Sequence, residues 1–364
     1  MRNLLILLFV TINAFGQQEQ LSKVRLHRAS TQHEIMRDFI SFLSIPNIAS
    51  DSVQIQHNAD WLAQYMRNHA INNVQLLHAH ASAPPVVYGE CITPGATKTI
   101  IFYAHYDGQP VDPLKWEKGL QPFQPVLFDN SLFKGGKQID FPSESKYYED
   151  NWRIYGRGAS DDKAGVMAIL NAFSAIKRNG LSPGVNVKFF FEGEEEAGSP
   201  HLEELLVKYA DLLQSDMWII CDGPVHQSTR KQIVYGVRGD THLELTVFGP
   251  KRPLHSGHYG NWAPNPAMQL AQLLASMKDT SGIVTIKGFY EDVIPLTSVE
   301  KGALARIPSI DDALKNELGF IRSERKDLLI SSLNVPSLNI NGLQSAGVGT
   351  VSYTHLTLPT NREV

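Results

Sequence analysis

The sequence predicts an α/β fold, with a mostly parallel sheet flanked by helices and a second, smaller α+β domain. In the first 224 residues, short apolar runs rich in β-branched and aromatic residues alternate with amphipathic helical segments. Beyond about residue 237 the segments become shorter and contain several Pro and Gly. In addition, polar residues that can bind metal follow directly on four of the apolar runs.

Periodicity places the individual elements. Helices are expected at residues 20–45, ended by Pro46, and at residues 57–71, where Trp61, Leu62, Tyr65 and Met66 share one side. The following segments predict strands at 86–92, 99–107, 185–193 and 216–224, and helices at 165–180 and 201–213. In the second domain, alternation predicts a half-exposed strand at 241–250, and a helix is expected at 263–277.

Composition excludes some classes of protein. The chain has 364 residues, of which 43% are hydrophobic and 19% charged, with a net charge of −4 and a pI of about 6.4. A nucleic-acid-binding protein is not expected, because no run of basic residues is present. Only Cys91 and Cys221 occur, so two unpaired thiols are favoured over a single bridge.

The N-terminus resembles a secretory signal. Arg2 precedes an apolar stretch from Leu4 to Ile12, and small residues surround a cleavage site after Gly16. A signal peptide over residues 1–16 predicts a secreted or periplasmic protein, and a plain N-terminal membrane anchor is the alternative. No other segment is apolar enough to span a membrane, so no span is expected once the signal is removed.

The ends of the predicted strands share one chemistry. They carry His105 with Asp107, the pair Asp161 and Asp162, the run Glu194 to Glu196, and Asp222. Each has a structural explanation by itself, such as a helix cap for the aspartates. Together they would repel one another at a common edge of the sheet, and one or two divalent cations would remove that cost.

The chemical properties of these residues indicate a different role for each in metal binding and catalysis. His105 would supply an imidazole nitrogen, and Asp107 would hold the other ring nitrogen. Asp161 or Asp162 could bridge two ions. One glutamate of the run would bind metal while its neighbour acts as a general base.

Four segments carry a resemblance to a known family. This chain resembles the zinc-dependent aminoacylase, carboxypeptidase and carnosinase-type metallopeptidases, and most of all their dipeptidase branch. The segments that match in order and spacing are TIIFYAHYDGQPVD, IYGRGASDDKAG, FFFEGEEEAGS and LHSGHYGNWAPNPA. The similarity extends over roughly residues 30–350.

The resemblance implies a role for each site residue. The implied metal ligands are His105, Asp161, Glu196 and Asp222. Asp107 would orient the imidazole and Glu195 would be the general base. His255 would help to hold the oxyanion, often from the partner subunit of a homodimer. Alternatively, His255 is an ordinary polar residue of a loop. His258 lies nearby in the sequence, which makes the choice between the two histidines less clear.

The resemblance also implies cofactors, substrates and domains. Two divalent metal ions are expected, with zinc preferred and manganese or cobalt compatible. The expected reaction is hydrolysis of dipeptides or short peptides by an exopeptidase, and the alternative is an N-acyl amino-acid deacylase. The implied domains are a catalytic domain over residues 17–238 and a lid and dimerisation domain over residues 239–350.

The end of the chain departs from the family. The family's last metal-binding histidine lies well downstream of the lid, and residues 351–364, including His355, do not match the family pattern. A truncated or misjoined reading frame would explain this, and the catalytic and lid domains would then be incomplete. An inactive metal-binding fragment is the corresponding alternative. Neither a Gly-x-Ser-x-Gly segment nor an HExxH pair is present, which argues against serine and thermolysin-like hydrolases.

Overall fold

The computed structural model of the chain describes residues 2–223 and 225–345, with side chains described from residue 18 onward. The chain divides into two compact units, and the boundary falls at residue 224. Helix α1 (Arg2–Leu43) covers the helix expected at residues 20–45 except for its last two residues, and it extends through the segment expected as a signal peptide. Within the described residues, no helix combines the length and the apolar character needed to cross a membrane. The tail at residues 351–364 lies outside the described residues.

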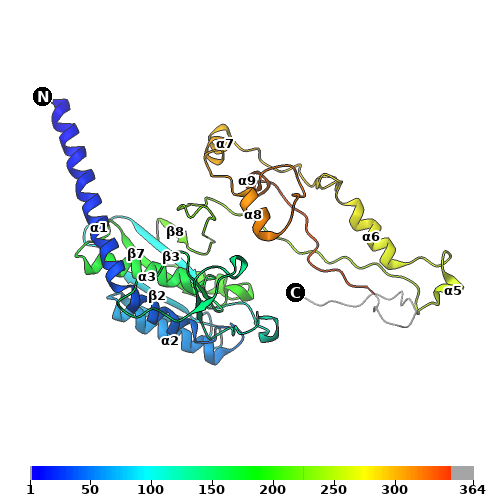
Figure 1. The fold of residues 1–364 in the computed structure, drawn as a ribbon, viewed down its shortest axis with the longest axis horizontal. Coiled ribbons are helices and arrows are strands. Elements are labelled where there is room, and N and C mark those ends of the chain that lie inside the picture. Colours follow the sequence, from blue (N-terminus) through cyan, green and yellow to red (C-terminus); the bar gives the residue numbers. More distant parts are fainter. Residues whose placement is uncertain (1, 224, 346–364) are drawn as a thin grey trace. The chain divides into compact units, whose positions relative to one another are not determined.

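A five-stranded sheet forms the centre of the first unit (Figure 1). Its strand order is β1 (Asn72–Leu77), β2 (Val86–Cys91), β7 (Asn186–Glu192), β3 (Thr99–His105) and β8 (Met217–Ile220). Strands β7, β3 and β8 are parallel, while β2 is antiparallel to both β7 and β1. Four strands therefore run in one direction and β2 alone runs in the other, which confirms the mostly parallel sheet.

Helices cover both faces of this sheet. Alternate side chains of β7 point to opposite faces, as the pleat of a strand requires. Phe189 and Phe191 join α1, α2 (Ser52–Asn68) and α3 (Lys163–Arg178) in one buried cluster. Phe190 faces the other way, where it packs in a second cluster with Leu205 of α4 (Leu202–Lys208). Because β7 is buried on both faces, its residues 189–191 are apolar without alternation.

A smaller sheet is formed by residues that lie between β3 and β7 in the sequence. Its three antiparallel strands are β4 (Val126–Phe128), β5 (Gln138–Ile139) and β6 (Arg153–Tyr155), in the order β5-β4-β6. Single 3₁₀ turns occur at η1 (Pro113–Lys115), η2 (Leu132–Lys134) and η3 (Glu195–Ala197). The segment before Asp161 therefore leaves from this sheet, so only three of the four expected strand ends belong to the central sheet.

The described residues of the second unit contain short helices. These are α5 (Ser256–Tyr259), α6 (Pro266–Ser276), α7 (Ser298–Leu304), α8 (Asp311–Leu318) and α9 (Leu329–Ser332). Helix α6 confirms the helix expected at residues 263–277, with Asn265 as its N-cap.

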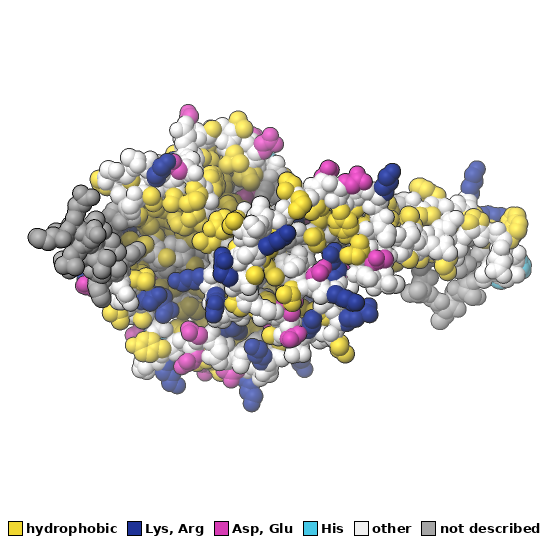
Figure 2. Space-filling view, turned by 90° about the horizontal axis from the view of Figure 1, so that it is seen from above, with side chains coloured by type: hydrophobic (Ala, Val, Ile, Leu, Met, Phe, Trp, Pro, Cys, Tyr) yellow, Lys and Arg dark blue, Asp and Glu magenta, His cyan; other side chains and the backbone are white. Residues whose placement is uncertain are grey.

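The strand expected at residues 241–250 is wrong, because the structure gives these residues neither helix nor strand. Leu243 and Phe248 are 84% and 83% exposed. A strand needs a paired neighbour and a covered face, and alternation in sequence does not supply either. Exposed hydrophobic side chains also lie among charged ones on the face of the molecule drawn in Figure 2.

Candidate metal centre

Three neighbouring parallel strands deliver polar residues to one edge of the central sheet. Strand β3 ends at His105, β7 ends at Glu192, and β8 ends two residues before Asp222. In the register of the sheet, His105 lies directly beside Glu192. The carboxyl ends of parallel strands are where open α/β sheets bind their ligands.

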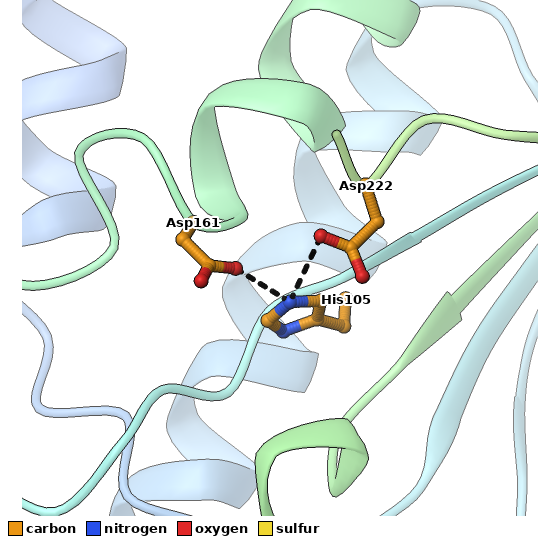
Figure 3. A group of neighbouring side chains, drawn as sticks. All are labelled: His105, Asp161 and Asp222. Atoms are coloured by element: carbon orange, nitrogen blue, oxygen red, sulfur yellow. Dashed lines mark hydrogen bonds and ion pairs between the residues drawn. The ribbon is translucent and has the colours of Figure 1, made fainter. Parts of the chain in front are cut away.

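The imidazole of His105 lies at the centre of this edge. The side chain is 1% exposed, and its Nε2 lies 2.9 Å from Oδ1 of Asp161. The same nitrogen is 3.7 Å from Oδ1 of Asp222. Figure 3 shows both carboxylates directed at this one ring nitrogen. Glu195 is also close, with Oε2 at 3.9 Å from Nε2.

The donor set fits a divalent metal ion. His105, Asp161 and Asp222 each offer one ligand atom, and these atoms all lie within 4.8 Å of one another. An imidazole nitrogen with carboxylate oxygens and no thiolate suits zinc, and also manganese or cobalt. One ion could therefore be held by these three side chains, with room for water because Asp161 is 64% exposed.

Asp107 supports the site from beneath. Its carboxylate is fully buried, and Oδ1 lies 3.3 Å from Nδ1 of His105, outside hydrogen-bond geometry. Oδ1 also accepts the backbone N–H of Glu195 at 3.1 Å, and Oδ2 accepts that of Glu196 at 3.0 Å. One side chain thus lies against the imidazole and fixes the turn of the glutamate run.

The charges in the cluster shift one another's pKa values. Burial opposes protonation of His105, but the carboxylates of Asp107 and Asp222 outweigh it and raise the pKa of the imidazole to about 11. The interaction with the imidazole of His105 holds the pKa of Asp222 below its usual value. Burial raises the pKa of Glu195, with Asp222 and Glu196 adding to the effect. A raised pKa suits a carboxylate that must accept a proton from water.

The two members of the Asp pair differ in environment. Asp161 faces the imidazole, whereas Asp162 is 3% exposed and accepts the backbone N–H of His105 at 3.2 Å. Burial raises the pKa of Asp162 to about 7. Of the two residues that the sequence left open as a bridging ligand, the structure brings Asp161 into the group.

Two of the expected site residues are not among the three that form this group. Glu196 accepts a short hydrogen bond from the side chain of Gln109, so its role as a ligand stays a prediction. His255 belongs to the second unit, where it caps α5 and its Nδ1 accepts the N–H of Gly257 at 3.0 Å. Its role in holding an oxyanion also stays a prediction.

Sequence reasoning missed one buried polar residue beside the site. Glu192 is 1% exposed and accepts a hydrogen bond from the Tyr103 hydroxyl at 2.7 Å. Glu194, which the sequence included in the glutamate run, is also buried, and its carboxylate accepts the backbone N–H of His201 at 3.0 Å. The only available signal was spacing, since Tyr103 and His105 are two residues apart and share one face of β3.

Comparison with known proteins identifies the family. The chain matches the model of peptidase family M20/M25/M40 over residues 101–315, which includes all three residues of the metal group. The chain belongs to this family. The match confirms the metallopeptidase resemblance of the sequence.

Relatives in the M20/M25/M40 family are dipeptidases by name. Cys-Gly metallodipeptidase DUG1 of Candida albicans is 29% identical over 325 residues, which cover 84% of this chain and 63% of that protein. Beta-Ala-His dipeptidase of Homo sapiens is 31% identical over 268 residues, which cover 72% of this chain and 48% of that protein. The chain thus spans about half to two thirds of the length of these curated relatives.

A solved structure shares the fold. The M20 family metallo-carboxypeptidase Sso-CP2 from Sulfolobus solfataricus superimposes with a TM-score of 0.66 at 30% identity. The superposition covers 89% of this chain and 68% of that chain. The fold class inferred from the sequence is thereby confirmed.

Proposed function

We propose that the protein is a metal-dependent exopeptidase that hydrolyses the peptide bond of dipeptides or short peptides. The observation that carries the proposal is the meeting of His105, Asp161 and Asp222 around one point. Glu195, within 3.9 Å of the same imidazole nitrogen, supplies a base beside that point. The dipeptidase names of the relatives support peptide substrates over other amides.

The residues divide the chemistry between them. A bound ion supplies Lewis acidity and lowers the pKa of water in its coordination sphere. Glu195 accepts the proton of the attacking water at Oε2 and returns it to the leaving amine. Asp107 keeps Glu195 in place through the backbone N–H. The buried imidazole of His105 does not need to reorient, because Asp107 lies against its other nitrogen.

Finer features of the proposal follow from the family resemblance. Two zinc ions are proposed, with Glu196 joining the group when Gln109 releases it. His255 would stabilise the oxyanion, and a homodimer would form through the second unit. Export is proposed from the pattern of residues 1–16.

Substitution of the base tests the mechanism. Glu195→Gln keeps the size of the side chain and removes its ability to accept a proton. We expect metal content, measured by mass spectrometry of the dialysed protein, to be unchanged and turnover to be abolished. Unchanged turnover would refute the assigned base. Loss of metal together with turnover would instead make Glu195 a ligand.

A substrate panel tests the reaction class. The chain is loaded with Zn²⁺, Mn²⁺ or Co²⁺ and assayed for amine release from Cys-Gly, β-Ala-His, other dipeptides and N-acetyl amino acids. The proposal predicts cleavage of dipeptides. Cleavage of N-acetyl amino acids alone would favour the deacylase alternative, and metal binding without any cleavage would favour the inactive-fragment alternative.

A further inference from the structure

Two loops beside the metal group are attached to the same segment, the end of α1 and the loop after it (residues 42–48). One loop leads from the small sheet through Asp161 into α3. The other begins directly after His105, the last residue of strand β3. Each attachment is made by one fully buried polar side chain.

Lys163 makes the first attachment. Its side chain is 0% exposed, and Nζ donates to the carbonyl oxygens of Phe42 at 2.7 Å and Ile45 at 2.9 Å. The ammonium also lies 4.4 Å from the centre of the Phe42 ring. The last carbonyls of a helix lack partners within the helix, and a cation at this end is favourable. Lys163 therefore fixes the loop of Asp161 to the end of α1.

Asn47 makes the second attachment. It is 0% exposed, and its Nδ2 donates to the carbonyl oxygen of Tyr106 at 2.9 Å. Its own carbonyl accepts the N–H of Gly108 at 2.8 Å. The residue directly after His105 is thus held by the same segment that holds Lys163.

The two loops and the start of α3 are packed closely together, so their backbones have little room to move. The Asp162 carboxylate accepts the backbone N–H of His105. A Cβ added to Gly165 would lie 2.2 Å from Oδ1 of Asp162 and 2.7 Å from the carbonyl oxygen of Cys221. The start of α3 therefore packs against the residue before Asp222 without space for a methyl group. Asp161 itself is 64% exposed, so its position depends on these neighbours and not on its own packing.

We propose that Lys163 and Asn47 are positioning residues of the metal centre, which fix Asp161 and His105 relative to each other through residues 42–48. This inference rests on the proposed metal-dependent function. Neither residue touches the metal group, and both act through the backbone next to Asp161 and His105. Removing either attachment should leave the ligands present but loosely arranged.

Metal affinity tests the proposal without reference to turnover. Lys163→Met and Asn47→Ala each remove one attachment. Lys188→Met is a matched control, because Lys188 Nζ also donates to two backbone carbonyls, those of Leu212 at 2.7 Å and Gln214 at 2.9 Å. The affinity of each variant for Co²⁺ and for Zn²⁺ is measured separately, without substrate, by competition with a chromogenic chelator. Folding is checked by circular dichroism. Cobalt absorption in the visible range also reports the ligand geometry.

We expect Lys163→Met and Asn47→Ala to bind metal about 10- to 100-fold more weakly, the usual effect of losing support behind a ligand, and to change the cobalt spectrum. Lys188→Met should match the parent chain in both. Parent-like affinity in folded Lys163→Met, or an equal loss in Lys188→Met, would overturn the proposal. If Lys163→Met does not fold, Asn47→Ala decides by the same criterion. A parent chain that binds neither ion would contradict the proposed function itself.

Discussion

Asp107 accepts the backbone N–H of Glu195 at 3.1 Å while its carboxylate lies against the ring of His105. One buried side chain thus fixes the distance between the imidazole and the proposed base. The contact joins the end of strand β3 to η3, the turn after strand β7. Together with the pairing of β3 and β7, this connection holds the metal group and the base in a constant geometry.

Asp107→Asn should weaken this connection. In Asn an NH2 group replaces one of the two carboxylate oxygens, so one of the N–H groups of Glu195 and Glu196 would face a donor instead of an acceptor. We expect zinc affinity and turnover each to fall by about 10- to 100-fold. Asp112→Asn is the control, because Asp112 is the exposed N-cap of η1 and accepts the backbone N–H of Leu114. An Asp107→Asn protein with unchanged zinc affinity and turnover would contradict the role given to Asp107.

Metal binding should release a proton from His105. In the metal-free protein the pKa of this imidazole is raised to about 11, so the ring is protonated at neutral pH. An ion that takes Nε2 must displace that proton, and affinity should therefore rise with pH. Calorimetry at pH 7 in two buffers with different ionisation enthalpies should give about one proton released per chain. Zero released protons would place the ion elsewhere.

Glu192→Gln should change how stability depends on pH. Burial raises the pKa of Glu192 above its usual value, so the folded chain holds this proton more tightly than the unfolded chain. The native carboxyl therefore loses stability as the pH rises from the unfolded pKa of about 4.3 through the folded pKa. Gln cannot ionise and still accepts the Tyr103 hydroxyl.

Thermal unfolding of the metal-free proteins at several pH values measures this effect. The melting temperature of Glu192→Gln relative to the parent chain should rise between acidic and neutral pH. A difference that is the same at every pH would show that Glu192 has an ordinary pKa.

Gly193→Ala should disturb the turn that carries the base. A Cβ at this position would lie 2.3 Å from the hydroxyl oxygen of Tyr106 and 3.0 Å from the carbonyl oxygen of Pro85. Because Tyr106 is fully buried and donates to Pro85, neither atom can move aside easily. We expect a lower melting temperature and a large loss of turnover. Gly184→Ala, which meets no atom within 4 Å, should behave like the parent chain.

The sequence predicted the core of the fold because its signals were local. Strand β7 contains three consecutive aromatic residues, and α3 repeats its apolar residues at helical spacing. Strand β1 was missed, since Asn72–Leu77 is half polar and is stabilised by pairing with β2. The wrong strand at residues 241–250 has the opposite cause, because its alternation lacks a partner in the described structure.

The candidate site was predictable where residue type decided the role. His105, Asp161 and Asp222 follow apolar runs, and the structure brings them together. The attachments of Lys163 and Asn47 were not predictable, because they depend on carbonyl groups more than 50 residues away in sequence. The choice between Asp161 and Asp162 as the metal ligand was likewise not predictable, because it depends on which carboxylate accepts the backbone N–H of His105.

Anomalous diffraction from a crystal of the chain grown with Zn²⁺ tests the central claim most directly. We expect a zinc peak bonded to Nε2 of His105 and to carboxylate oxygens of Asp161 and Asp222, at distances of about 2.0 to 2.2 Å. A zinc peak that excludes His105, or no peak at this edge of the sheet, would contradict it.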